Sequence, residues 1–201
     1  MNKKIVHDAL VLTAFTLVLG LILGGVYAIT KEPIAAAEYE TAQKAYRTVF
    51  SSADSFEALE DFDKKAATGV VTSAGYKDSI DDIEVAKDAG GETLGYVITV
   101  TAKDASQDTI TYAVGIQNDG TVNGYSITSI AETPGLGAKA VEEAFYSQFN
   151  NKNVDEFTVV KQTPGDDSEI ESISGATITS RAMANGVNAA LYYFRQELGG
   201  E

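Results

Sequence analysis

The first hydrophobic pattern along the chain is an uncharged apolar run near the N-terminus. It covers residues 9–29 and contains no Asp, Glu, Lys or Arg over 21 positions. A helix of that length spans roughly 31 Å, about the thickness of the hydrocarbon core of a bilayer. Lys3 and Lys4 precede the run, so the positive-inside rule predicts a cytoplasmic N-terminus and an extracytoplasmic remainder. We predict a single-pass anchor in a prokaryotic cell membrane.

A cleaved signal peptide is the alternative interpretation of this run. Ala35, Ala36 and Ala37 offer the small residues that a signal peptidase needs. The apolar core of a signal peptide usually has about 7–15 residues, so the longer run here favours an uncleaved anchor. Gly20 and Gly24 are four residues apart, a spacing that lets a neighbouring helix approach closely, although glycine is common in such helices anyway.

The segment after the apolar run is rich in helix-forming residues. Pro33 lies just beyond the run, where proline can begin or kink a helix. The residues at 35–50 predict a stalk helix, and the polar, acidic residues at 51–65 indicate a loop or a short helix. We therefore assign residues 1–30 to the cytoplasmic N-terminus and anchor, 31–65 to a stalk and linker, and 66–201 to a domain.

Strand-like patterns dominate the first half of that domain. Clustered or alternating β-branched and aromatic residues predict the following strands: 70–72, 83–85, 94–101, 110–116 and 125–130. Gly90 and Gly91 mark one turn. Asp119 and Gly120 mark another, which makes residues 110–124 a candidate hairpin.

Helical spacing returns in the second half. Residues 138–149 predict a helix with one apolar face, formed by Ala140, Val141, Ala144, Phe145 and Phe149. Residues 157–160 predict another strand. The last helix has its apolar side chains at Met183, Val187, Ala190, Leu191, Phe194 and Leu198, and Gly199 and Gly200 end it. The expected fold class is α+β, with helices covering a mostly antiparallel sheet.

Composition excludes several kinds of chemistry. The chain has 15 basic and 29 acidic residues, a formal net charge of −14, so nucleic acid is not an expected partner. It has no cysteine, which excludes disulfides, thiolate nucleophiles and cysteine-ligated clusters. His7 is the one histidine, so a histidine triad is excluded and no metal site or catalytic residue is predicted. Redox chemistry would therefore need an organic cofactor.

Two motifs remain as candidates for a binding site. Residues 174–177, Ser-Gly-Ala-Thr, directly precede the last helix, where free backbone N–H groups favour a phosphate. The alternative is a plain helix cap without a ligand, for which these residue types are common. Residues 132–137, Glu-Thr-Pro-Gly-Leu-Gly, contain a Pro-Gly pair typical of a type II turn. The alternative there is an ordinary surface turn.

Both motifs resemble a known family. Ser-Gly-Ala-Thr is similar to the site at which FMN is esterified through its phosphate to threonine in membrane proteins of the Rnf and Nqr complexes, and Thr177 stands at the threonine position. Glu-Thr-Pro-Gly-Leu-Gly is similar to a loop of the same proteins that helps to enclose the flavin ring. Together with the N-terminal anchor and residues 30–34 and 145–149, they resemble the RnfG family of the Rnf electron-transport complex over essentially the whole chain.

The resemblance implies a role for each motif position. Thr177 would carry covalent FMN, placed there by a flavin transferase. The phosphate end would be shaped by Ser174, Gly175 and Ala176, with Thr179 and Ser180 as further donors. The ring contacts would come from Glu132, Thr133 and Leu136. Glu171 stands where the family usually has Asp, which keeps the charge but lengthens the side chain by one methylene.

The function implied by the resemblance is that of an electron relay. The chain would work with the other membrane and peripheral subunits of an ion-translocating ferredoxin:NAD oxidoreductase, and it would not be a self-sufficient enzyme. An Nqr-type flavin subunit or an anchored extracellular flavin carrier is the nearer alternative, and a structural module of a membrane assembly is the remoter one. A hydrolase is disfavoured, because the chain has no Cys and its one histidine lies beside the N-terminus, which leaves no plausible nucleophile–base pair.

Overall fold

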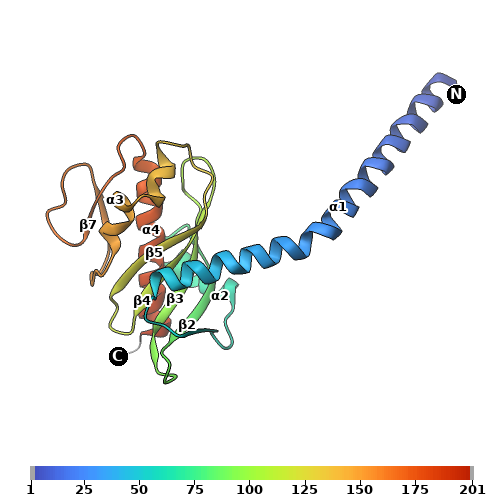
Figure 1. Cartoon of the computed structure of the whole chain (residues 1–201). Helices are drawn as coiled ribbons and strands as arrows, with labels where there is room; N and C mark the ends of the chain where they lie inside the picture. The colour runs from blue at the N-terminus through green and yellow to red at the C-terminus, as the bar shows by residue number, and fades with distance from the viewer. Residues whose placement is uncertain (1–2, 200–201) are drawn as a thin grey trace. The chain divides into compact units, whose positions relative to one another are not determined.

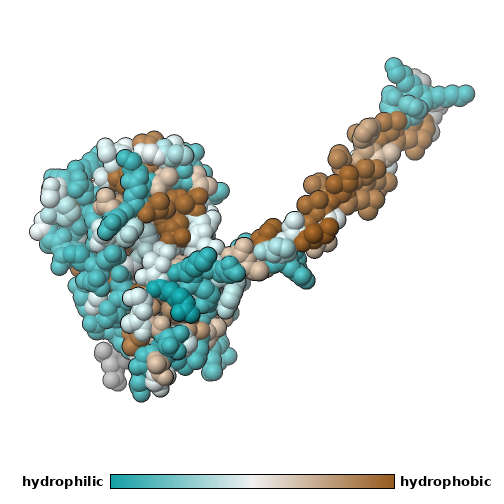
Figure 2. Space-filling model, viewed as in Figure 1, coloured by the Kyte–Doolittle hydropathy of each residue, from teal (hydrophilic) through white to brown (hydrophobic). Residues whose placement is uncertain are grey.

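The computed structural model describes residues 3–199, which form two compact units divided between Thr41 and Ala42. The described part of the first unit is helical and lies within α1 (Lys3–Val49; Figure 1), whose last residues, from Ala42 on, are part of the second unit. Pro33 lies inside this helix. Helix α1 includes the predicted stalk except for Phe50, which confirms its helical character. It is the described helix that is long and apolar enough to cross a membrane, and Figure 2 shows its apolar surface as a continuous stretch.

The apolar part of α1 satisfies its polar groups internally. Three threonine hydroxyls donate to carbonyls one turn earlier, at Thr13, Thr16 and Thr30. Large side chains such as Leu21 and Ile29 are each 77% exposed, so nothing in the described chain covers them. A helix with internally bonded polar groups and outward apolar side chains is suited to lipid.

The second unit is built on a five-stranded antiparallel sheet in the order β1-β2-β3-β4-β5 (Figure 1). The strands are β1 (Ser55–Ala58), β2 (Ser79–Lys87), β3 (Thr93–Ala102), β4 (Ile110–Gln117) and β5 (Val122–Ser129). The predictions at 83–85, 94–101, 110–116 and 125–130 fall on β2 to β5, with only residue 130 outside, and are confirmed. The predicted hairpin is also correct, and Gly120 takes a φ of +83° in its turn.

The prediction of a strand at 70–72 was wrong, because these residues lie in α2 (Lys64–Ser73). The Asp63 Oδ1 accepts hydrogen bonds from Lys65 N and Ala66 N at 2.8 and 3.1 Å, which starts the helix. Ala67 and Val71 are then buried one turn apart. The prediction of a loop or short helix at 51–65 missed β1, a four-residue strand.

We expect the Asp63 cap to stabilise the domain measurably. Substituting Asp63→Ala leaves the N–H groups of Lys65 and Ala66 without this acceptor and should lower the free energy of unfolding by about 1 kcal/mol. Urea unfolding of the detergent-solubilised chain measures the change. Glu60→Ala, at an exposed position before the helix, is the control and should change the stability little. Equal effects of the two substitutions would show that the cap is not the cause.

Two layers cover the sheet. Helices α2 and α4 (Thr177–Tyr193) pack on one face, where the main core includes Ile98, Tyr112 and Met183. The last residues of α1 pack on the other face, where Tyr46, Val49 and Phe50 lie against the sheet residues Ala86, Val97 and Ala113. The C-terminal end of α1 is thus part of the folded domain.

The predicted helix at 138–149 is broken into three short pieces. They are η1 (Gly137–Val141), α3 (Glu143–Tyr146) and η2 (Ser147–Phe149). Ala140, Phe145 and Phe149 are buried as predicted, but Val141 and Ala144 are exposed. The backbone of Glu142 is extended, with a φ of −82° and a ψ of 143°, and separates η1 from α3. The Tyr125 hydroxyl donates to Ala140 O at 2.7 Å just before this break.

The C-terminal part of the domain supplies the elements on either side of the Ser-Gly-Ala-Thr motif. The predicted strand at 157–160 is confirmed as β6 (Thr158–Val160), and it pairs in parallel with β7 (Glu169–Glu171), which was not predicted. Helix α4 confirms the predicted last helix and continues into the π-helical turn η3 (Phe194–Leu198), which Gly199 ends. Gly200, the other predicted end residue, lies outside the described residues. Buried Asn188 on α4 bonds both the N–H and the C=O of Phe157, which ties the strand to the helix.

Candidate functional site

The Ser-Gly-Ala-Thr motif forms a tight turn that leads into α4. Ala176 N donates to Ile173 O at 2.9 Å, and Gly175 takes a φ of +78°, as the third position of a type II turn requires. Ser174 and Gly175 are exposed, and Thr177 is half-buried as the first residue of the helix. The turn therefore presents backbone and hydroxyl groups at the surface.

The N-terminus of α4 has no side-chain cap. The cap residue is Ala176, which has no side-chain oxygen. The first helical bond at this end runs from Ser180 N to Ala176 O at 3.0 Å. The N–H groups of Thr177, Ile178 and Thr179 therefore have no acceptor within the helix. Free donors with a partial positive charge form a site suited to an anion.

Thr179 and Ser180 lie inside the domain. Ser180 Oγ accepts from Ile173 N at 2.9 Å and donates to Ala176 O at 3.0 Å, so it locks the turn to the first turn of the helix. Thr179 Oγ1 is buried and has no hydrogen-bond partner among the described residues. Ser174 and Thr177, by contrast, are hydroxyl residues of the Ser-Gly-Ala-Thr turn that reach the surface.

The Glu-Thr-Pro-Gly-Leu-Gly loop also forms a tight turn. Leu136 N donates to Thr133 O at 3.1 Å, and Gly135 takes a φ of +77°, which agrees with the predicted type II turn. The side chains of Thr133 and Leu136 are exposed, Leu136 by 43%. This loop therefore offers one apolar and one hydroxyl side chain at the surface.

The two motifs meet, although they are far apart in the sequence. A Cβ atom placed on Gly175 would lie 3.1 Å from Leu136 Cδ2. A Cβ atom on Gly137 would lie 2.7 Å from Thr179 Oγ1 and 2.3 Å from Glu132 Oε2. The absence of a side chain at each glycine lets the loop and the helix start approach this closely.

Glu132 joins a third segment to the site. Its side chain is buried, with 7% exposed, and its Oε1 accepts from Ser106 N at 2.7 Å and from Gln107 N at 3.1 Å. The carboxylate therefore points inward and holds the loop between β3 and β4. Ser106 and Gln107 were not predicted, because they contribute backbone N–H groups that leave no pattern of residue types.

A cavity of about 280 Å³ lies beside Ser174. Its walls include Lys139, Phe145 and Glu171. Gln148, also in its wall, bonds the backbone of Glu171 on both sides, accepting from its N–H at 2.7 Å and donating to its C=O at 3.3 Å. Exposed apolar side chains near the motifs include Leu136 in the loop and Ile178 in the first turn of α4, which is 60% exposed. Donors for a phosphate and apolar surface for a ring are thus found together.

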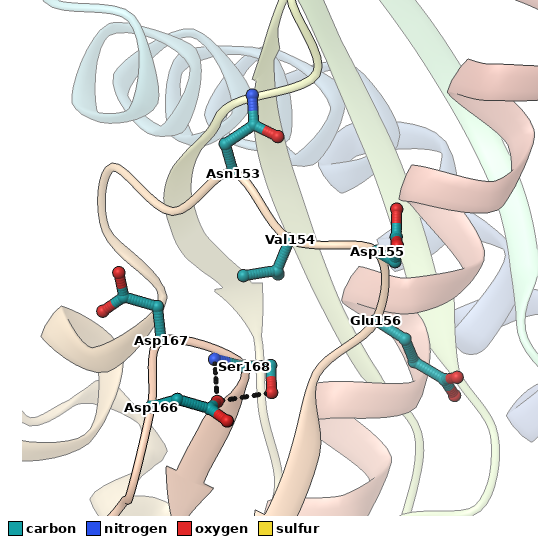
Figure 3. Close-up of a pocket in the computed structure, with 7 residues that line it drawn as sticks. All are labelled: Asn153, Val154, Asp155, Glu156, Asp166, Asp167 and Ser168. Atoms are coloured by element: carbon teal, nitrogen blue, oxygen red, sulfur yellow. Dashed lines mark hydrogen bonds between the residues drawn. The ribbon is translucent and has the colours of Figure 1, made fainter.

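A larger cavity, of about 670 Å³, has no residue of either motif in its lining (Figure 3). Its lining residues include four carboxylates, those of Asp155, Glu156, Asp166 and Asp167. Asp166 accepts hydrogen bonds from Ser168 N and Oγ, as Figure 3 shows, and these lower its pKa. Such a cavity repels a phosphate. Within residues 3–199, no group of three or more His, Asp or Glu side chains is arranged to hold a metal ion.

Comparisons with known proteins agree on one family. Residues 106–192 match the FMN-binding domain model and residues 1–49 match the RnfG N-terminal region model. The G subunit of the proton-translocating ferredoxin:NAD(+) oxidoreductase complex of Clostridium ljungdahlii is 32% identical over 190 residues, which are 94% of this chain and 91% of that protein. Its counterpart in the Na(+)-translocating complex of Acetobacterium woodii is 37% identical over 53% of this chain and 52% of that protein.

Solved structures share the fold of the chain. NqrC of Shewanella oneidensis aligns with a TM-score of 0.53 over 74% of this chain and 84% of its own, at 17% identity. The C subunit of the Na(+)-translocating NADH-quinone reductase of Parabacteroides distasonis aligns with the same TM-score at 21% identity, over 74% of this chain and 79% of its own.

Proposed function

We propose that this chain, which belongs to the RnfG family of ion-translocating ferredoxin:NAD(+) oxidoreductase complexes, carries FMN on Thr177 through a phosphoester and relays electrons within such a complex. Its FMN-binding domain and its membership of a complex with several protein components follow from the family. The covalent bond, the residue that forms it and the relay role are the proposal.

The observation that supports the proposal most strongly is the uncapped start of α4. The same chain caps α2 with the Asp63 carboxylate but places Ala176 at the corresponding position of α4. An Ala at this position costs about 1 kcal/mol relative to Ser, Thr, Asp or Asn. The free N–H groups are then available to a phosphate, and the Thr177 hydroxyl is on the first residue of the helix.

The residues around the turn fit FMN. A phosphate at Thr177 would accept hydrogen bonds from the free N–H groups of the first helical turn, with the exposed hydroxyl of Ser174 as a further donor. Gly175 and Ala176 add little bulk at the phosphate. Leu136 and Ile178 offer apolar surface to the ring system. When bound, FMN supplies the reversible electron transfer for which the chain has no side chain of its own.

The other predicted positions hold this arrangement in place. Glu132 fixes the loop that carries Leu136, and Ser180 fixes the turn to α4. Thr133 presents its exposed side chain from the same loop and stays a candidate for a ring contact. Thr179 is a buried neighbour of Gly137 and acts in this proposal through its backbone N–H.

Attachment would be a phosphoryl-type transfer by a separate flavin transferase. The Thr177 oxygen forms a bond to the FMN phosphorus of FAD, the pyrophosphate bond of FAD breaks, AMP leaves and the hydroxyl proton passes to solvent or to the transferase. Lys3 and Lys4 precede the apolar run of α1, so the domain would lie outside the cytoplasm. A covalent bond prevents the loss of the flavin there by dilution.

Peptide mass analysis tests the proposal. The chain is expressed with and without a flavin transferase, purified and digested. We expect an FMN-sized addition on the peptide that contains Thr177, and only when the transferase is present. An unmodified peptide beside an active transferase would contradict the proposal and would leave α4 with an ordinary, poorly capped start in a structural protein of the assembly.

A further inference from the structure

Two carboxylates lie together between the start of β2 and the end of β3, away from the residues assigned to FMN. Asp78 precedes β2 and is only 1% exposed, yet neither of its carboxylate oxygens has a hydrogen-bond partner among the described residues. Asp104 follows β3, and its Oδ1 is likewise buried without a partner. Buried carboxylate oxygens without a donor are rare and costly.

The surroundings compensate this charge only in part, because the charge of Lys103 favours the ionised form of Asp78 less strongly than burial and the charge of Asp104 oppose it. The described ion pairs include neither Asp78 nor Asp104. Asn185 on α4 donates one hydrogen bond, from Nδ2 to Asp104 Oδ2 at 3.3 Å. The backbone N–H groups of Asp78 and Lys103 face the Asp78 carboxylate outside hydrogen-bond geometry. Burial, followed by the charge of Asp104, raises the pKa of Asp78 to about 6.

We propose that Asp78 and Asp104 bind a divalent cation with oxygen ligands, of the Ca²⁺ class. One divalent ion balances the two carboxylates, whereas a monovalent ion would leave a net negative charge in a buried place. The Asn185 amide can turn its carbonyl oxygen towards such an ion. Ca²⁺ suits the site better than Mg²⁺, because Ca²⁺ accepts irregular sets of carboxylate and amide oxygens whereas Mg²⁺ demands a near-ideal octahedron. Asp104 is only half-buried, so water can complete the ligand set on its side.

The position of the pair gives the cation a structural role. Asp104 begins the loop in which Ser106 N and Gln107 N donate to Glu132. A cation bound by Asp104 and Asp78 would fix the base of this loop against β2. Through these two hydrogen bonds the loop holds the Glu132 carboxylate, whose other oxygen lies beside Gly137. The inference concerns the apoprotein and does not require that FMN is attached to Thr177.

Thermal unfolding of the full chain in detergent tests the proposal, after removal of bound ions with a chelator. We expect CaCl2 at about 5 mM, above the range in which extracellular calcium modules bind, to raise Tm by at least about 3 °C. MgCl2 should raise it less, and NaCl at equal ionic strength should not raise it. Hydrogen exchange of residues 103–109 should slow when Ca²⁺ is added.

Substitutions assign the effect to the pair. Asp78→Asn removes the buried charge and keeps the shape of the side chain, so it should raise Tm in chelator and abolish the response to Ca²⁺. Asp104→Asn should also abolish the response. Asp61→Asn is the matched control, because Asp61 is exposed and its φ of +57° suits Asn equally well; it should respond like the unmodified chain.

Two results would overturn the inference. One is a Tm of the unmodified chain that does not change with Ca²⁺, which would mean that the pair holds a proton rather than a metal ion. The other is a Ca²⁺ response of the same size in Asp78→Asn and Asp104→Asn, which would place the ion elsewhere on this acidic surface.

Discussion

A chain with Thr177→Val is expected to fold normally and to carry no covalent flavin. Valine has nearly the shape of threonine but lacks the hydroxyl oxygen that would bond to phosphorus. Thr177 is half-buried at the first helical position, so the free energy of unfolding should change by no more than about 0.5 kcal/mol. The substitution should therefore change the flavin content and not the stability: in the presence of the transferase, covalent flavin incorporation should drop from near completeness to none.

Flavin fluorescence of the denatured band in a gel measures this loss, because only a covalently bound flavin survives denaturation. Ser174→Ala is the control: it removes the other exposed hydroxyl of the turn and should keep the fluorescent band. A fluorescent Thr177→Val chain would contradict the assignment of Thr177. If Ser174→Ala lost the band while Thr177→Val kept it, the attachment would lie on Ser174.

The sheet was predictable from the sequence because its strands carry two-residue periodicity over long stretches. In β3, inward-facing residues such as Ile98 and Val100 alternate with residues of the opposite face, and the pattern excludes a helix. Residues 70–72 are too few to distinguish the two periods, since Val70 and Val71 fit a strand as well as a buried turn of helix. There the Asp63 cap decides the structure.

Other features were set by contacts that no local pattern encodes. The break in the helix predicted at 138–149 lies at Glu142, whose backbone is extended with a φ of −82° and a ψ of 143°. The Tyr125 hydroxyl of β5 bonds Ala140 O just before it. The inward direction of the Glu132 carboxylate depends on two backbone N–H groups of another loop. The motif residues could be found from their types, but their convergence around Gly137 and Gly175 could not, because it needs the folded sheet.

Gly137→Ala is expected to destabilise the site most among small substitutions in the two motifs. The new Cβ would lie 2.3 Å from Glu132 Oε2, 2.9 Å from Glu132 Cδ and 2.7 Å from Thr179 Oγ1. The carboxylate cannot move away freely, because its other oxygen holds Ser106 N and Gln107 N. We expect a loss of about 2–3 kcal/mol in the free energy of unfolding, measured by urea unfolding with tyrosine fluorescence.

Two further variants separate this clash from a general effect of alanine. Gly69→Ala lies in α2, where a Cβ would meet nothing within 4 Å, so it should be neutral or stabilising by up to about 1 kcal/mol. Combining Gly137→Ala with Glu132→Ala removes the carboxylate that the methyl group would strike. The double variant should therefore lose at least about 1 kcal/mol less than the sum of the single losses. Additive losses would mean that Gly137 and Glu132 are not in contact, and that the loop and the start of α4 are held together by other groups.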